Sequence, residues 1–112
     1  MHLGEFEQLL LLALIRLSDG AHGAAIAAEI EARTERQVSP GAVYTALDRM
    51  EARGFVQSWL GEATEARGGR RRKYYRLLPQ GARALTRSYG AIKQMAAGLA
   101  AKLESLAEET GR

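Results

Sequence analysis

A run of basic side chains between residues 67 and 76 is the part of the sequence best suited to binding a charged ligand. The run contains no acidic residue, and its cationic members are Arg67, Arg70, Arg71, Arg72, Lys73 and Arg76. Such local density attracts a polyanion even though the formal net charge of the chain is only +3. The neighbouring hydroxyls of Tyr74 and Tyr75 could donate to a phosphate oxygen. The segment predicts contact with nucleic acid, and an ordinary solvated charge run is the alternative.

Residues that could support catalysis or bind a metal are not grouped in this sequence. There is no cysteine, which excludes disulfides, thiolate metal sites and cysteine nucleophiles, and favours the reducing cytoplasm. His2 and His22 are isolated, with no second ligand at a suitable spacing. Glu5 and Glu7 face different sides of a helix, and no GxxxxGK phosphate loop occurs. We therefore expect no enzyme, no metal site and no cofactor.

The stretch from Ser39 to Gly54 carries signals for both ends of a helix. Ser39 can cap the first free amides, and Pro40 suits the first helical position. Gly54 suits the left-handed turn that closes many helices. Between these signals, an apolar stripe that should face a core consists of Val43, Ala46, Leu47 and Met50.

The opposite side of this helix is unusual for a surface that meets only water. Its residues are small or short and polar, and they are Gly41, Thr45, Asp48 and Ala52, with Tyr44 and Arg49 at the edges. A solvated face would be expected to carry long Glu and Lys side chains, whereas this face allows a large partner to approach closely. A plain amphipathic surface helix is the alternative when the stretch is taken alone.

Two further helices are predicted before this one. Residues 4–17 are apolar on nearly every side, so that a domain of this size can cover only part of the helix. The rest, including Leu11 and Leu14, then needs either the C-terminal part of the same chain or a second subunit. A central core helix in a monomer is the alternative. Residues 22–33 form the second predicted helix, and with the helix that follows they make a candidate helix-turn-helix.

After Gly54 the period of the apolar residues changes from helical to two, which predicts strands. The strands cover residues 55–60 and 73–77, and a long connection with glycines and arginines separates them. Connections of this length are uncommon in compact domains and are usually functional or disordered. We expect a hairpin with a basic wing over residues 61–73.

Heptad spacing marks the C-terminal part of the chain. A single helix is predicted from Pro79 to about residue 109, with a length of about 45 Å at about 1.5 Å per residue. Because this length exceeds the domain before it, the far end needs another helix as a partner. The seam that would face a second copy comprises Leu85, Tyr89, Ile92, Ala96, Leu99, Leu103 and Leu106. A helix lying across its own domain is the alternative.

The order of these elements is that of a winged helix-turn-helix. We predict a mainly α fold with a small β-hairpin, a DNA-binding domain over residues 1–78 and a C-terminal dimerisation helix over residues 79–112. The length of 112 residues suits one domain with an appended helix. The apolar run at residues 9–15 is too short to span a bilayer, so that no membrane partner is expected.

Four segments together resemble the PadR family of bacterial transcriptional regulators. They are LGEFEQLLLLALIRL, HGAAIAAEIEART, VSPGAVYTALDRMEARGFV and GEATEARGGRRRKYYRLLPQGARAL, and they cover about residues 3–85. The resemblance implies a cytoplasmic homodimer that represses transcription by binding double-stranded DNA. It makes the helix at residues 39–53 the recognition helix and GGRRRKYY the wing. The predicted contacts with DNA are Ser39, Gly41, Tyr44, Thr45, Arg49, Arg70, Arg71, Arg72, Lys73, Tyr74 and Tyr75.

Two features set limits on what the resemblance implies. Leu78 stands where the family commonly has Thr before Pro, which removes a helix cap. Some relatives bind flat aromatic molecules through an aromatic residue on the last helix, where this sequence offers only Tyr89. An aromatic-drug pocket is therefore not expected, and any small-molecule effector is unknown. A winged-helix module that binds only protein, without DNA, is the alternative function.

Overall fold

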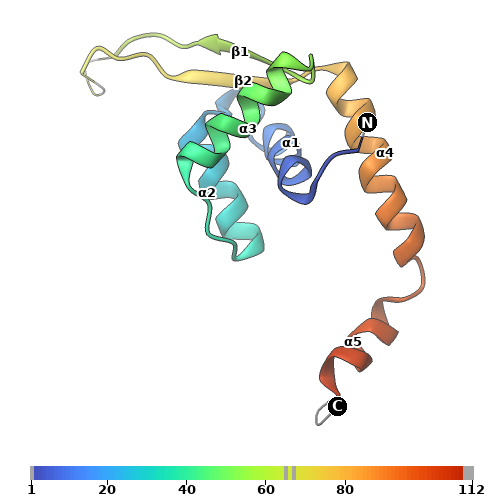
Figure 1. Cartoon of the computed structure of the whole chain (residues 1–112). Helices are drawn as coiled ribbons and strands as arrows, with labels where there is room; N and C mark the ends of the chain where they lie inside the picture. Colours follow the sequence, from blue (N-terminus) through green and yellow to red (C-terminus); the bar gives the residue numbers. More distant parts are fainter. Residues whose placement is uncertain (1, 65, 67, 110–112) are drawn as a thin grey trace.

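The helices and strands follow one another as the sequence predicts, except that the C-terminal part forms two helices (Figure 1). The computed structural model describes residues 2–64, 66 and 68–109. The elements are α1 (Glu5–Leu17), the 3₁₀ turn η1 (Ser18–Gly20), α2 (Gly23–Thr34), α3 (Pro40–Ala52), β1 (Val56–Leu60), β2 (Lys73–Leu77), α4 (Pro79–Ala96) and α5 (Ala100–Glu108). The predicted mainly α fold with one small hairpin is confirmed. Within the described residues, no helix has the length and apolar character needed to cross a membrane.

The hydrophobic core is built by α1, α2 and α3 together with both strands. Its largest fully buried side chains are Leu3, Leu10, Leu11, Ile26, Val43, Leu47, Met50, Val56 and Tyr75. The buried residues of α3 recur at the four- and three-residue spacings of one helix face, which is why this segment forms a helix that packs on the core. Burying each such side chain contributes about 1.5–3 kcal/mol. These elements therefore fold around one shared core.

The hairpin is joined to the helices through its second strand. β1 and β2 are antiparallel, with Trp59 opposite Tyr74. On its other edge β2 meets the segment between η1 and α2, where the Tyr75 N–H donates to the Ala21 carbonyl at 2.9 Å and His22 bridges to Tyr74. In Figure 1 the far end of the hairpin extends beyond the helices. The base of the wing is therefore fixed by the core, while its tip projects from it.

The buried side of α1 lies inside the chain's own domain. Leu11 and Leu14 are 0% and 3% exposed, so that their predicted place in a dimer interface is wrong. The physical reason is that α2, α3, β2 and α4 all contact α1 and together cover more of it than one small domain was expected to cover. Leu12 and Ile15 are the large apolar side chains of α1 that stay exposed.

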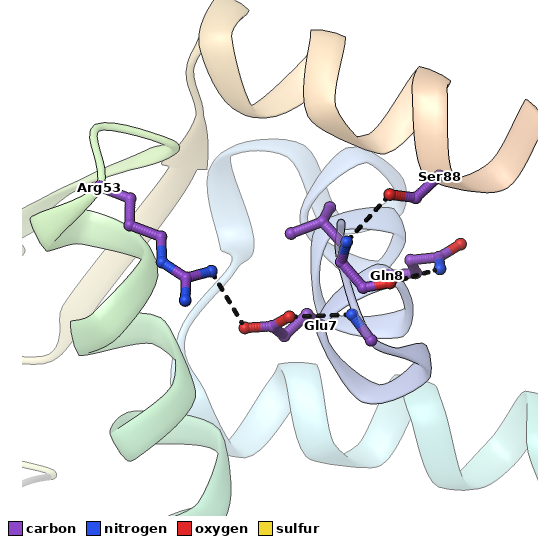
Figure 2. Close-up of polar contacts among 6 residues, drawn as sticks. Glu7, Gln8, Arg53 and Ser88 are labelled. Carbon is purple, nitrogen blue, oxygen red and sulfur yellow. Dashed lines mark hydrogen bonds and ion pairs between the residues drawn. The ribbon is translucent and has the colours of Figure 1, made fainter. Parts of the chain in front are cut away.

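The first half of α4 packs on the same domain (Figure 2). Ser88 Oγ accepts a hydrogen bond from the Leu3 backbone N–H at 3.0 Å, which ties the segment before α1 to α4. Arg53, after α3, forms a 3.5 Å ion pair with Glu7 of α1. Leu85 is buried in this intrachain core, so that its predicted role in a dimer interface is also wrong. The start of α4 thus stabilises the domain to which it is attached.

The prediction of one continuous C-terminal helix is wrong. The chain leaves helical geometry at residues 97–99, between α4 and α5. Gly98 has φ +79°, a left-handed conformation that glycine adopts without strain and that commonly ends helices. In Figure 1, α5 extends away from the core helices, and none of its residues is buried. The members of the predicted seam that are exposed are Tyr89, Ile92, Ala96, Leu99, Leu103 and Leu106.

Tyr75 has a fully buried side chain, although its place on a basic strand suggested a surface role. Its hydroxyl has no hydrogen-bond partner among the described residues. Burial, and then the nearby negative charge of Asp48, raises the pKa of this hydroxyl from 10.0 to about 12. A buried polar group without a partner costs about 1–3 kcal/mol. The ring of Tyr75 therefore stabilises the core, whereas its hydroxyl opposes that stabilisation.

We expect Tyr75→Phe to be at least as stable as the wild type at neutral pH, because it keeps the ring and removes the unpaired hydroxyl. The folded wild type holds this proton more tightly than the unfolded chain, so that its stability should fall as pH rises from 10.0 to about 12. The contribution of Tyr75 to that fall is about 2–3 kcal/mol. Urea unfolding at neutral and alkaline pH measures both effects. A Tyr75→Phe variant with a clearly lower free energy of unfolding at neutral pH would contradict the conclusion that the hydroxyl has no hydrogen-bond partner.

Candidate nucleic-acid interface

The start of α3 is fixed by the contacts that the sequence predicts. Ser39 Oγ accepts a hydrogen bond from the Ala42 backbone N–H at 3.1 Å, and Pro40 is the first residue of the helix. The connection from α2 is held by Glu31, whose Oε2 accepts from the Val38 backbone N–H at 2.8 Å. The predicted cap is confirmed, and the entry of the chain into α3 is defined by hydrogen bonds on both sides of Ser39.

The two faces of α3 divide as predicted. The buried face comprises Val43, Ala46, Leu47 and Met50. The opposite face is exposed along its length and comprises Gly41, Thr45, Asp48, Arg49 and Ala52. At the edge toward β1, Glu51 Oε2 accepts from the Ser58 N–H at 3.2 Å and from its hydroxyl at 2.7 Å. α3 therefore presents a narrow face of small side chains while the hairpin and core hold it from behind.

Tyr44 forms one edge of this exposed face. Its ring lies against Gly23, the first residue of α2, so closely that a side chain at that position would collide with the ring. The side chain is 39% exposed. Tyr44 is therefore held between α2 and α3, with part of its surface open to a ligand that covers both helices.

The wing is closed at its base by a short network of hydrogen bonds. The Gly61 N–H donates to the Arg72 carbonyl at 2.7 Å, and nearer the tip the Gly69 N–H donates to the Thr64 carbonyl at 3.0 Å. Arg71 Nε donates to the Gly61 carbonyl at 2.7 Å. Arg71 was predicted to contact DNA, and the structure also gives it the task of tying the two sides of the loop together. The basic loop is therefore fixed at its base by hydrogen bonds.

The other basic side chains of the wing differ in exposure and in what they contact. Arg70 and Arg72 are exposed, and Arg67 lies outside the described residues. Lys73, at the start of β2, places its Nζ 3.9 Å from Asp48 Oδ1 on α3. This ion pair brings the base of the wing next to the exposed face of α3, so that one ligand could contact both.

The two tyrosines of β2 do not share one surface, because successive strand residues point to opposite faces. Tyr75 is buried in the core, and its predicted contact with DNA is wrong. Tyr74 lies on the other face of the hairpin, where its ring stacks on Trp59 at 5.7 Å and meets the edge of His22 at 5.7 Å. A contact between Tyr74 and DNA stays a prediction.

Sequence reasoning placed Asp48 on the exposed face but gave it no function. The strand register could have indicated that Asp48 pairs with Lys73. In this register Lys73 lies opposite Leu60, on the same face of the strand as the buried Tyr75. That face is turned toward the core, and α3 packs beside it. The register of the hairpin therefore determines which basic residue meets α3.

The core of three helices, the exposed third helix and the hairpin define a winged helix-turn-helix protein. The Transcriptional regulator PadR-like family matches residues 11–87, which is well over half of the chain. The chain belongs to the PadR-like family, and the protein is a transcription regulator. A comparison with curated proteins finds no match. The family consists of regulators, a class that is generally not enzymatic.

Solved structures of other regulators share the fold. A transcriptional regulator from Clostridium thermocellum is 26% identical, with a TM-score of 0.68 over 80% of this chain and 84% of that one. A PadR family regulator from Clostridium difficile R20291 is 29% identical, with a TM-score of 0.63 over 81% and 94%. A PadR family regulator from Eggerthella lenta is 25% identical, with a TM-score of 0.65 over 89% and 87%. The likeness thus extends over most of each chain.

Replacing the cap of α3 should destabilise the protein. We expect Ser39→Ala to lower the free energy of unfolding by about 1 kcal/mol, because the Ala42 N–H loses its partner. Urea unfolding followed by circular dichroism measures the change. Ser39→Asp is the matched control, since a carboxylate can also accept this hydrogen bond. Equal stability of the alanine variant and the wild type would show that the cap contributes nothing.

Proposed function

We propose that the protein is a cytoplasmic homodimer that represses transcription by binding a pseudo-palindromic operator in double-stranded DNA. The observation that carries this proposal is the exposed face of α3 beside a wing of exposed arginines, joined to it by the pair of Lys73 and Asp48. Repression and dimer formation are what the resemblance to PadR regulators implies. In this proposal residues 1–78 bind DNA and residues 79–112 join the two copies.

The shape of α3 supports insertion into the major groove. That groove is about 12 Å wide and admits one helix. Gly41 and Thr45 lack bulk, so that the helix backbone can approach the base edges closely. Tyr44 and Arg49 stand at the two sides of this narrow face, where the walls of the groove carry phosphates. Ser39, at the N-terminus of the helix, completes the proposed contact surface.

The wing supplies the charge that the proposal needs. Arg70 and Arg72 are exposed on a loop whose base is tied by Arg71. Each phosphate that a cation neutralises releases counterions, so that the affinity falls as salt rises. Contacts of this kind position a protein on the duplex without reading its sequence. We assign this positioning role to the wing.

The apolar surface of the two C-terminal helices supports a dimer. Its exposed large side chains are Tyr89, Ile92, Met95, Leu99, Leu103 and Leu106. Exposed apolar patches of this extent mark interaction surfaces in soluble proteins. A second copy related by a twofold axis would offer the same surface in return. It would also carry a second α3, as a pseudo-palindrome with half-sites about 34–36 Å apart requires.

The wing assignment is tested by the salt dependence of DNA binding. We expect Arg70→Ala with Arg72→Ala to reduce the slope of log affinity against log salt by about 3.6, because the two wings of a dimer lose four phosphate contacts at about 0.9 each. Arg71 is kept, since it holds the loop. Fluorescence anisotropy with a duplex selected by the wild type measures the slope.

The matched control for the wing variant removes two exposed arginines from α4. Arg83→Ala with Arg87→Ala lowers the net charge by the same amount outside the wing. We expect its salt slope to stay close to that of the wild type. Equal slopes for the wing variant and the wild type would refute the wing assignment. If the wild type retains no duplex at all, the alternative of a winged helix that binds only protein is favoured.

The dimer assignment is tested by placing charge on the apolar surface formed by Leu99 and α5. We expect Leu99→Glu with Leu103→Glu to convert the dimer to a monomer, because carboxylates cannot be buried there without a partner. Sedimentation equilibrium measures the mass. Ala101→Glu is the matched control, since residue 101 lies on the opposite side of α5 by helical spacing. A dimer that persists in the double variant would place the interface elsewhere.

A further inference from the structure

Asp48 is an acidic side chain in the middle of the surface that we propose enters the groove. It follows Thr45 by three positions and Gly41 by seven, which places all three on one side of α3. Its side chain is 64% exposed. A carboxylate at this place is repelled by the phosphates of any duplex, so that it lowers the affinity for DNA in general. Its presence needs a gain that compensates for this repulsion.

A contribution of Asp48 to the stability of the fold does not compensate for its repulsion from DNA. The only ion pair described for Asp48 is the one with Lys73, at 3.9 Å between Nζ and Oδ1, and both side chains are substantially exposed. Exposed pairs of this kind contribute little to stability. The effect of Asp48 must therefore be sought in what the exposed face binds.

The base edges in the major groove give a carboxylate something to select. Cytosine offers an amino group at N4, which donates a hydrogen bond to a carboxylate. Guanine offers two acceptors, and thymine offers an acceptor and a methyl group, so that both leave a carboxylate unpaired. Adenine offers one amino donor beside the N7 acceptor, which repels the second carboxylate oxygen and suits an amide better.

We propose that Asp48 is a specificity-determining residue that accepts a hydrogen bond from the N4 amino group of one cytosine in each half-site. This inference rests on the proposed function, since it requires α3 in the major groove. Lys73 of the wing is a positioning residue for Asp48: its ammonium group holds the carboxylate and offsets its repulsion from the phosphates. Base reading by α3 and backbone contact by the wing are thereby coupled through one ion pair.

The test is selection from a library of duplexes with a randomised central segment, using the full chain. The wild type should enrich cytosine at one position of each half-site, with a preference of about tenfold or more over guanine and thymine. Asp48→Ala should lose the preference at that position alone and keep the others. Asp48→Asn should move the preference toward adenine, because an amide both donates and accepts.

Two further variants separate base reading from other roles of Asp48. Lys73→Ala should weaken binding to all duplexes, because a cation is lost, and should also reduce the preference for cytosine, because the Asp48 carboxylate loses its positioning partner. Glu35→Gln, outside α3, removes one negative charge and should leave the selected sequence unchanged. Circular dichroism and thermal unfolding establish whether each variant is folded. If Asp48→Ala does not fold, the conservative variant Asp48→Asn provides the test.

The outcomes distinguish this inference from the function on which it rests. A wild type that selects no duplex overturns the proposed DNA binding. A wild type that selects an operator, together with Asp48→Ala and Asp48→Asn variants that select the same bases, overturns the role of Asp48 alone. An equal loss of affinity for every duplex in Asp48→Ala and in Lys73→Ala would show that the ion pair has only a structural role. That result would also overturn the role of Asp48 in reading a base. A shift confined to one base position supports it.

Discussion

The burial of one side of α3 is the constraint on which the rest of the structure depends. Val43, Leu47 and Met50 fix the rotation of this helix about its axis, because turning it would expose them to water at about 1.5–3 kcal/mol each. The Glu31 carboxylate accepts a hydrogen bond from the Val38 N–H at the entry to α3, and the Glu51 carboxylate accepts one from the Ser58 N–H of β1. These two contacts fix the position of α3 in the domain. A surface helix held in this way can carry small side chains on its outer face, since that face contributes little to the fold.

The features that the sequence predicted correctly depend on interactions between residues that are close together in the chain. The cap at Ser39, the proline after it and the left-handed Gly54 each act within a few residues, and all are present in the structure. The change from helical to alternating periodicity gave the strands within a residue or so. The order of helices and strands then admitted few arrangements, which is why the winged fold could be predicted.

The features that sequence predicted wrongly depend on how the elements pack. Leu11, Leu14 and Leu85 are as apolar as residues of a subunit interface, and only the packing of α2, α3, β2 and α4 around α1 assigns them to one chain's core. The strand period put Tyr75 on one of two faces without saying which face meets the core. Gly98 lies within the stretch predicted as a single helix, whereas its left-handed φ ends α4. Each case needed a long-range contact or a backbone angle that composition does not specify.

The division of charge between α3 and the wing has a physical logic. Arginines on a loop such as Arg70 and Arg72 attract every duplex alike, so that a protein relying on them alone would bind the whole genome with similar strength. Selectivity requires groups that favour one base edge and penalise the others, and small or acidic side chains on a rigid helix meet this requirement. The carboxylate of Asp48 sits among such small side chains and within reach of Lys73. In the proposed complex, this ion pair couples attraction by the wing to discrimination by the helix and keeps both on the same surface.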